Sequence, residues 1–499
     1  MRSLPAWLSA ALVLALTLGT LLAVALRAEV GRGLSSGDWA AIRFTVGQAI
    51  VSALVSVALA VPVARALARR RFRWRGALVM LLGAPFILPV IVAVLGLLAV
   101  FGRGGLLNAG LAGLGVAPVS IYGAGGVVLA HVFFNLPLAV RLILQGWLSI
   151  PAERFQLAAQ LNAPIWRLLE RPMLARVVPG AVLVIFLICL TSFAVALTLG
   201  GGPKATTVEL AIWQAVRFDF DLGRAALLSC IQFGLCAVAA VIAWRVTPVD
   251  GFGSGLDRVV ARWDQSAWDW AWLLAVTLFL ATPLAMVVWR GVPGLADLGP
   301  GVWAAAGRSV AVAAGSTVLC LLLGLSLALR GGIVMSIVGV LPLAASALVM
   351  GTGLFLMLFP LANPATLALP VTLCVNAVMA LPFVLRVLGP AVTDIRASYG
   401  RLAETLGLRG LSLLRIVILP RLRRPLGFAA GLTAALSLGD LGVIALFATD
   451  AQETLPLAMY RLMGAYRMDA AAGAALLLLA LALGVFWICD RGGRMDVDA

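Results

Sequence analysis

Long apolar runs recur along the whole chain, and they constrain its fold more than any other feature. A helix needs about 20 apolar residues to cross the roughly 30 Å of bilayer hydrocarbon, and runs of this order are separated only by short polar segments. With 63% hydrophobic and 12% charged residues, the composition excludes a water-soluble fold. We predict an all-α polytopic membrane protein with about twelve transmembrane helices, at about 5–26, 44–64, 77–101, 123–140, 178–200, 225–244, 268–289, 309–329, 333–360, 366–385, 427–447 and 469–489.

The basic residues are distributed unevenly between alternate loops. If the N-terminus is inside, 26 of the 37 Lys and Arg residues fall in the inner segments, and cytoplasmic loops are the ones enriched in these residues. We therefore predict that both termini are cytoplasmic. A net charge of +16 would suggest nucleic acid if it formed a patch on a soluble surface, but its spread between apolar runs favours a role in topology and predicts no nucleic-acid partner.

The second half of the chain repeats the pattern of the first. The segment 134–141 has a counterpart in 379–386, at an offset of 245 residues, and Thr206 corresponds to Thr454 at an offset of 248. Six spans is an even number, so the two copies have the same orientation and form a parallel repeat, with any pathway between them. We expect two six-helix domains, 1–244 and 267–499, joined by a cytoplasmic linker at 245–266.

One inner segment in each half is too long for a simple turn: about 141–177 in the first half and about 386–426 in the second. In the second, apolar and polar positions follow a helical pattern. We expect a short amphipathic helix, then a break at Gly407 and Gly410, then a second helix closed by Pro420. An amphipathic helix outside the membrane needs another surface to cover its apolar face.

These residues carry a resemblance. The segment 399–407, followed by a Leu-Pro pair at Leu419 and Pro420, resembles the EAA loop of binding-protein-dependent ABC importer permeases. In that family the helix before the glycine is the coupling helix, which sits in a cleft of the ATPase subunit. The resemblance implies the same role for about 396–406 and about 151–161, with two ABC ATPase subunits as partners. The residues implied to form the coupling loops are Gln156, Ala158, Ala159, Leu161, Asn162, Ala403, Glu404, Leu406 and Gly407.

The first loop departs from this pattern. Asn162 stands where the second loop has Gly407, and Pro172 follows Asn162 by ten residues, whereas Pro420 follows Gly407 by thirteen. Asn tolerates a left-handed backbone, so the turn can persist. The three missing residues are almost one helical turn, so we expect the first loop to dock differently from the second.

Three longer stretches, 129–137, 200–213 and 436–447, are similar to the fused permeases of bacterial thiamine ABC importers, and the similarity extends over nearly the whole chain. This resemblance implies a permease subunit in the bacterial inner (cytoplasmic) membrane. It would translocate thiamine or its phosphates, delivered by a periplasmic solute-binding protein. Fused permeases of iron(III) importers share the layout and stay an alternative, as does a secondary transporter, for which Asp440 is the one clear coupling carboxylate.

Few side chains within the spans carry chemistry. An ionisable group at membrane depth is a functional hypothesis by default, and Asp440 can either face a cationic solute or accept hydrogen bonds from helix ends. Aromatic side chains can stack on a ligand or simply pack. The residues expected in a substrate pathway are Phe134, Phe193, Trp213 and Asp440.

Catalysis and cofactor binding are not expected of this chain. No arrangement of nucleophile, base and orienting group is visible, and the six cysteines and one histidine lack the spacing of a metal site. The glycine-rich run 200–207 lacks the Gly-Lys-Ser/Thr triplet of a phosphate loop. We therefore predict a non-enzymatic permease without metal or cofactor, with ATP bound and hydrolysed by the partner subunits.

Overall fold

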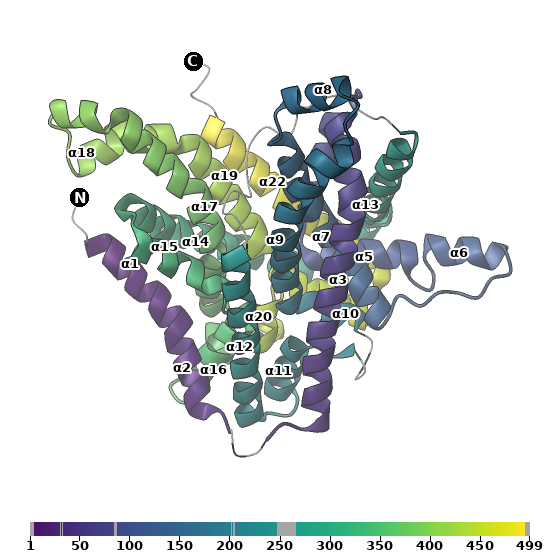
Figure 1. Cartoon of the computed structure of the whole chain (residues 1–499). Coiled ribbons are helices and arrows are strands. Elements are labelled where there is room, and N and C mark those ends of the chain that lie inside the picture. Colours follow the sequence, from purple (N-terminus) through teal and green to yellow (C-terminus); the bar gives the residue numbers. More distant parts are fainter. Residues whose placement is uncertain are drawn as a thin grey trace.

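The computed structural model describes residues 4–29, 31, 33–83, 87–200, 202, 205–246 and 266–494, and the fold is given for these ranges. Their regular structure is entirely helical, without a β-strand in any described segment. Within these ranges, eleven helices are long and apolar enough to span a membrane, and a bent pair of helices brings the number to twelve if it forms one span. The predicted all-α polytopic fold is confirmed (Figure 1).

The helices of the first half follow the predicted order of spans. They are α1 (Leu4–Leu14), α2 (Thr20–Arg27), α3 (Ser36–Arg69), α4 (Arg75–Leu81), α5 (Val90–Phe101), α6 (Leu106–Gly113), α7 (Ala124–Leu148), α8 (Ala152–Gln160), α9 (Arg171–Leu190), α10 (Ala194–Leu199), α11 (Val208–Arg217) and α12 (Leu222–Val246). A π-helical turn makes α1 and α2 one span.

The described residues of the second half contain ten α-helices. They are α13 (Trp268–Gly294), α14 (Pro300–Arg330), α15 (Ile333–Val340), α16 (Ala347–Leu358), α17 (Ala368–Thr405), α18 (Leu411–Leu413), α19 (Leu419–Leu438), α20 (Gly442–Phe447), α21 (Leu455–Gly464) and α22 (Met468–Arg494). The linker predicted at 245–266 lies almost wholly outside the described residues, between α12 and α13.

Several predicted spans are broken helices. The helix predicted at 178–200 stops at Leu190 before α10, and the one at 427–447 stops at Leu438 before α20. The span predicted at 333–360 bends by 90° before α16, whose first turn is capped by the Ser346 hydroxyl. The span predicted at 77–101 is divided between α4 and α5. Apolar length does not reveal such breaks, because polar caps and single glycines make them inside an apolar run.

The long inner loops contain more helix than predicted. Pro420 was expected to close a helix, but it lies inside a continuous one, directly after the π-helical turn Leu414–Ile418. Pro172 follows the equivalent turn, Trp166–Glu170. A proline lacks the N–H group and its ring crowds the carbonyl four residues earlier. The wider π-helical turn relieves this conflict, so the helix continues.

The internal repeat is also visible in hydrogen bonds. The Thr45 hydroxyl on α3 accepts from the Val208 N–H at the start of α11, at 2.9 Å. The Ser309 hydroxyl on α14 accepts from the Leu455 N–H at the start of α21, at 2.8 Å. The pairs match at offsets of 264 and 247 residues. They correct the predicted alignment of Thr206 with Thr454 by one residue, because Thr207 is the N-cap equivalent to Thr454.

The first span of each half crosses to the other half. The helices α1 and α2 pack on α14, α15 and α16, whereas α13 packs on α3 and α5 (Figure 1). Glycines allow these crossings, since a Cβ atom at Gly353 would lie 2.5 Å from the Thr20 carbonyl oxygen, and one at Gly96 would lie 2.6 Å from the Pro283 carbonyl oxygen. The two halves are therefore joined by exchanged helices.

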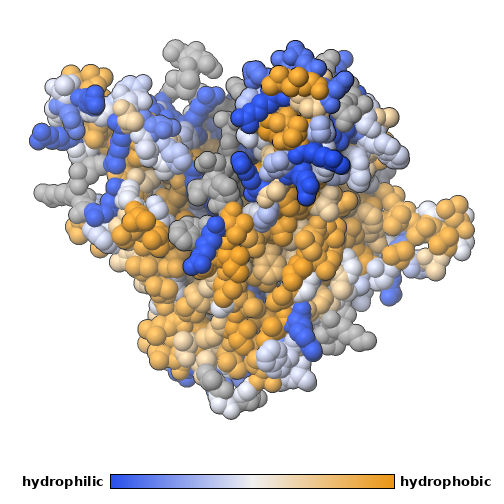
Figure 2. Space-filling view, in the orientation of Figure 1, coloured by the Kyte–Doolittle hydropathy of each residue, from blue (hydrophilic) through white to orange (hydrophobic). Residues whose placement is uncertain are grey.

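Polarity divides the surface into zones. Figure 2 shows a broad apolar zone over the middle of the molecule, with hydrophilic residues gathered over α8 and over the region of α17 and α18. Both regions lie at the top of Figure 1, and we call this the α8 face. The apolar zone fits lipid, which has no water to solvate polar groups, and the α8 face projects beyond it.

Candidate functional site: two loops on the α8 face and the interface between the halves

The first candidate coupling loop is a short helix closed by a left-handed turn. Pro151 precedes α8, and Asn162 after its end has a φ of 50°. The Ala163 N–H donates to the Ala158 carbonyl at 2.9 Å, and the Asn162 N–H donates to the Ala159 carbonyl at 3.3 Å. This is the hydrogen-bond pattern of a Schellman cap. Asn162 therefore takes the backbone conformation that glycine usually supplies, as predicted.

The second loop ends in the same way. Gly407 follows α17 with a φ of 66°, the Leu408 N–H donates to the Ala403 carbonyl at 2.9 Å, and the Gly407 N–H donates to the Glu404 carbonyl at 3.1 Å. The approach to the turn differs, because α17 is continuous through Thr405 whereas α7 ends at Leu148 before α8 begins. The first loop thus has a break where the second is one rigid helix.

Equivalent side chains of the two loops face the same way. Ala158 and Ala403 are buried against the protein, whereas Gln156, Ala159 and Glu404 are exposed. The exposed set includes two leucine pairs related by 245 residues, Leu157 with Leu402 and Leu161 with Leu406, each side chain being 55–69% exposed. Apolar side chains exposed on a polar face mark an interaction surface. Each loop therefore presents the same pair of leucines.

The three additional residues of the second loop lie after the turn. They are accommodated by Gly410, with a φ of 60°, and by the single helical turn α18. The segments that end at Asn162 and Gly407 keep an offset of 245 residues, and the π-helical turns and helices directly after the insertion, α9 and α19, keep an offset of 248. The difference in length therefore leaves the helix before each turn in the same register, and changes only the path to the returning helix.

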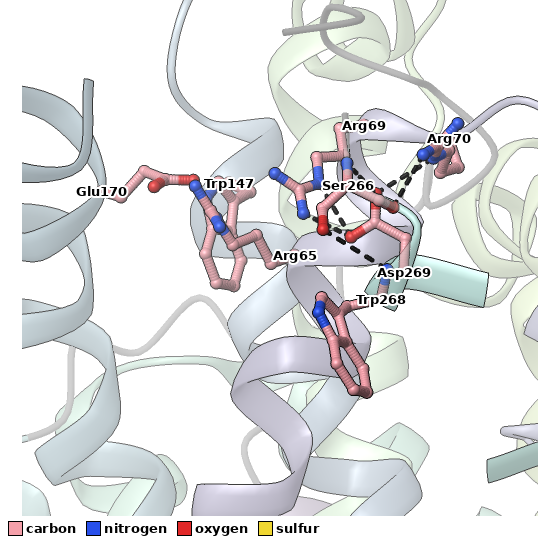
Figure 3. A network of polar contacts seen from close by, with 8 residues as sticks. All are labelled: Arg65, Arg69, Arg70, Trp147, Glu170, Ser266, Trp268 and Asp269. Carbon is pink, nitrogen blue, oxygen red and sulfur yellow. Dashed lines mark hydrogen bonds and ion pairs between the residues drawn. The ribbon is translucent and has the colours of Figure 1, made fainter. Parts of the chain in front are cut away.

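A buried carboxylate holds the base of the first loop (Figure 3). Glu170 is fully buried, and its Oε1 accepts from Arg65 Nε at 2.7 Å and from Trp147 Nε1 at 3.3 Å. The Arg65 guanidinium also lies over the Trp166 ring, 5.8 Å from its centre. Trp147 comes just before α8 and Glu170 just after the turn, so one carboxylate joins both ends of the loop to α3.

A second ionic cluster lies one turn further along α3 (Figure 3). Arg69 binds Asp269 at the start of α13, and Arg70 Nε donates to the same carboxylate at 3.0 Å. Arg70 also donates to the Ser266 carbonyl at 2.8 Å. Arg69 and Asp269 are buried. The charge distribution favoured a topological role for the basic residues, and Arg69 and Arg70 also link the first half to the crossing helix of the second.

The predicted pathway residues are brought together only in part. The rings of Phe193 and Trp213 lie 6.0 Å apart, and Trp213 Nε1 donates to the Ala445 carbonyl of the second half at 3.1 Å. Phe193 also lies near the break that contains Asp440. The ring centres of Phe134 and Phe133 lie 5.6 Å apart. Among the described residues, Phe134 does not join the Phe193 group. The structure thus groups Phe193, Trp213 and Asp440 at the interface between the halves.

Asp440 sits in the break between α19 and α20. Its Oδ1 accepts from the Gly442 N–H at 3.2 Å, and the amides of Val443 and Ile444 also face the carboxylate. A carboxylate at a helix start satisfies amides that lack helical partners. This geometry favours the helix-end acceptor among the two roles considered for Asp440.

Sequence reasoning missed Glu209. This residue lies on α11, one helical turn before Trp213, and is 1% exposed. It neighbours Gln232 on α12 and Ser346 of the second half, so it lies where the halves meet. The α11 helix is outside the candidate spans, and burial raises the pKa of Glu209 to about 8. The available signal was an acidic residue in an otherwise apolar stretch.

An acidic cavity lies on the side of the molecule opposite the α8 face, at the start of α3 (Figure 1). It has a volume of about 490 Å³ and is lined in part by Glu29, Asp38, Asp219 and Asp221. Arg224 pairs with Asp38 at 2.8 Å and with Asp219 at 3.1 Å.

No group of three or more His, Cys, Asp or Glu residues in the described ranges could hold a metal ion. Of the glycine-rich run 200–207, Gly201, Pro203 and Lys204 lie outside the described residues.

Comparison with known proteins identifies relatives of this chain. No family model matches the chain. The thiamine transport system permease protein of Salmonella typhimurium is 40% identical, with 98% of this chain and 97% of that protein covered, and that of Escherichia coli K12 is 40% identical over 91% and 89%.

A molybdenum transport system permease protein of Azotobacter vinelandii is 30% identical over 37% of this chain and 83% of that protein. This shorter permease thus matches less than half of this chain. These relatives give no support to the iron(III) alternative. The chain belongs to the family of thiamine transport system permease proteins.

Proposed function

We propose that this chain is the permease subunit of an ABC importer in the bacterial inner membrane, and that it translocates thiamine or its phosphates. The observation that carries this proposal is the near full-length similarity to thiamine permeases, combined with two equivalent exposed loops on one face. Both termini and the α8 face are then cytoplasmic, and the acidic cavity opens toward the periplasm, where a solute-binding protein delivers the solute.

The two loops supply the contact with two ABC ATPase subunits. Closure of an ATPase dimer can move a membrane protein only through elements that it grips. The leucines exposed next to each turn give each ATPase an apolar contact, and the Schellman caps fix the turns that end α8 and α17. ATP binding would draw the two loops together and switch the permease from the inward-facing to the outward-facing conformation. ATP hydrolysis would return it to the inward-facing conformation.

The interface between the halves supplies the solute pathway. Phe193 and Trp213 offer aromatic faces at this interface, and thiamine carries two aromatic rings, one of them cationic. Glu209 provides a carboxyl group one turn from Trp213. With the interface closed, its raised pKa keeps this carboxyl mostly protonated at neutral pH, and an arriving cation would favour the charged form.

The proposed function is tested by transport in a defined system. We expect liposomes that contain this permease with its ATPase subunits to accumulate radiolabelled thiamine only when ATP and the loaded solute-binding protein are both supplied. Accumulation driven by an ion gradient alone, without ATP, would refute the proposal. Ferric iron, offered with the same binding protein, serves as the control solute and should not accumulate.

The role of Glu209 gives a second expected outcome. We expect Glu209→Gln to raise the apparent KM for thiamine about tenfold, equivalent to about 1.4 kcal/mol of lost interaction. Asp440→Asn is the matched control, because the amide oxygen can still accept from the Gly442 N–H, and its KM should stay within about twofold of the parent. Equal effects of the two substitutions on KM would contradict this division of roles.

A further inference from the structure

The two coupling loops are anchored by different chemistry at equivalent positions. The anchor of the first loop consists of Arg65, Trp147 and Glu170. The offsets of 264, 245 and 248 residues relate these positions to Leu329, Val392 and Ile418 in the second half. Val392 and Ile418 are buried in one apolar cluster, with Leu329 packed against it. The same three places are therefore ionic and aromatic in one half and aliphatic in the other.

The ionic version gives the first loop a directional connection. Glu170 is fully buried and touches both Arg65 of α3 and Trp147 of α7. Charge-assisted hydrogen bonds constrain angle as well as distance, whereas aliphatic contacts do not. The first loop requires this constraint because the helix is interrupted between α7 and α8. The second loop has no such break, since α17 continues to Thr405.

The connection continues along α3. Arg69 and Arg70, one turn beyond Arg65, bind Asp269 of the crossing helix α13 (Figure 3). The end of α3 therefore contacts the first coupling loop on one side and the second half on the other. If a movement of the first loop displaces α3, the ion pairs of Arg69 and Arg70 with Asp269 transmit this displacement to α13.

We propose that Glu170 is a positioning residue for coupling: its carboxylate closes the base of the first loop, so that α8, α3 and α13 move as one body when the ATPase grips α8. This inference rests on the proposed function, in which α8 is the ATPase contact. The second loop achieves the same rigidity through its continuous helix, and its aliphatic anchor only fills space.

The test uses the complete importer in liposomes, with turnover of ATP measured with and without the thiamine-loaded binding protein. We expect Glu170→Gln to keep subunit assembly and basal turnover but to lose stimulation about tenfold, within the usual range of coupling effects. Asp297→Asn is the control and should change neither quantity, because Asp297 is exposed and follows the end of α13 opposite to Asp269.

A rescue variant separates positioning from general stability. The triple change Arg65→Leu, Trp147→Val and Glu170→Ile installs the aliphatic set of the second half and leaves no unpaired charge. Because α8 keeps its break, we expect this variant to assemble with parental thermal stability but to stay uncoupled. Full stimulation in either Glu170→Gln or the triple variant would overturn the proposal. If Glu170→Gln does not assemble, the triple variant decides alone, and its own failure to assemble would also overturn the proposal.

A cross-linking measurement distinguishes failure of this inference from failure of the proposed function. In an otherwise parental chain, Leu161→Cys should cross-link to a cysteine placed in the cleft of the ATPase. If the cross-link forms and Glu170→Gln couples normally, the anchor hypothesis fails and the ATPase contact stands. If no cross-link forms in the assembled importer, the proposed ATPase contact itself is wrong.

Discussion

Replacement of Gly407 by valine is expected to abolish most solute-stimulated ATP turnover of the assembled importer, while membrane insertion is unchanged. Gly407 has a φ of 66°, and the left-handed conformation costs about 1–2 kcal/mol for a residue with a Cβ atom, with more crowding for a β-branched one. No atom lies within 4 Å of the added Cβ, so the effect is confined to the backbone. The turn would open and displace Leu402 and Leu406.

The matched control for this prediction is supplied by the other half of the chain. Asn162 occupies the equivalent position with a φ of 50°, so Gly407→Asn should keep at least about half of the stimulation, because Asn tolerates this backbone. Stimulated and basal turnover are measured on reconstituted importers of equal subunit content. Unaltered stimulation in Gly407→Val would show that the turn does not set the contact.

Replacement of Gly96 by valine is expected to give the largest loss of stability. A Cβ atom at Gly96 would lie 2.6 Å from the Pro283 carbonyl oxygen and 3.1 Å from a Val287 methyl group. Small residues permit close approach of helices in membranes, and overpacking such a contact costs about 1–3 kcal/mol. Because α13 packs on α5 here, the clash would separate the crossing helix from the first half. Thermal unfolding in detergent measures the loss.

Gly47→Val is the control for this substitution. Gly47 lies within α3, and a Cβ atom there meets nothing within 4 Å. The same change of residue type should therefore lower the melting temperature by no more than about 1 °C, the effect of a few tenths of a kcal/mol in a large chain. Equal losses for Gly96→Val and Gly47→Val would mean that the exchanged helices do not depend on this contact.

Apolar length and the chemistry of single turns were predictable from sequence. The number of spans follows from hydrocarbon thickness, which sets a minimum run of residues. The turn at Gly407, and its persistence at Asn162, follow from the few residue types that tolerate a positive φ. Both kinds of feature are local, so a short stretch of sequence contains all the information needed.

Contacts between distant segments were not predictable in this way. Glu170 and Arg65 are 105 residues apart, and Asp269 and Arg69 are 200 residues apart, so no periodicity relates them. The breaks at Ser346 and Asp440 were hidden because hydropathy averages over one polar residue. Glu209 did carry a signal, as an acidic residue in largely apolar surroundings, where an unpaired charge is costly, whereas Glu170 lies between Arg167 and Arg171 and did not stand out.

The exchange of first helices imposes an order on biogenesis. The helices α1 and α2 leave the ribosome before α14, α15 and α16, against which they pack, exist. Until the second half has been synthesised, they reside in lipid with only α12 of their own half to pack on, whereas α13 finds α3 and α5 already inserted. Newly made chains arrested before α14 should thus expose the face of the α1–α2 span that later packs on the second half to membrane quality-control proteases, and chains arrested after α16 should not.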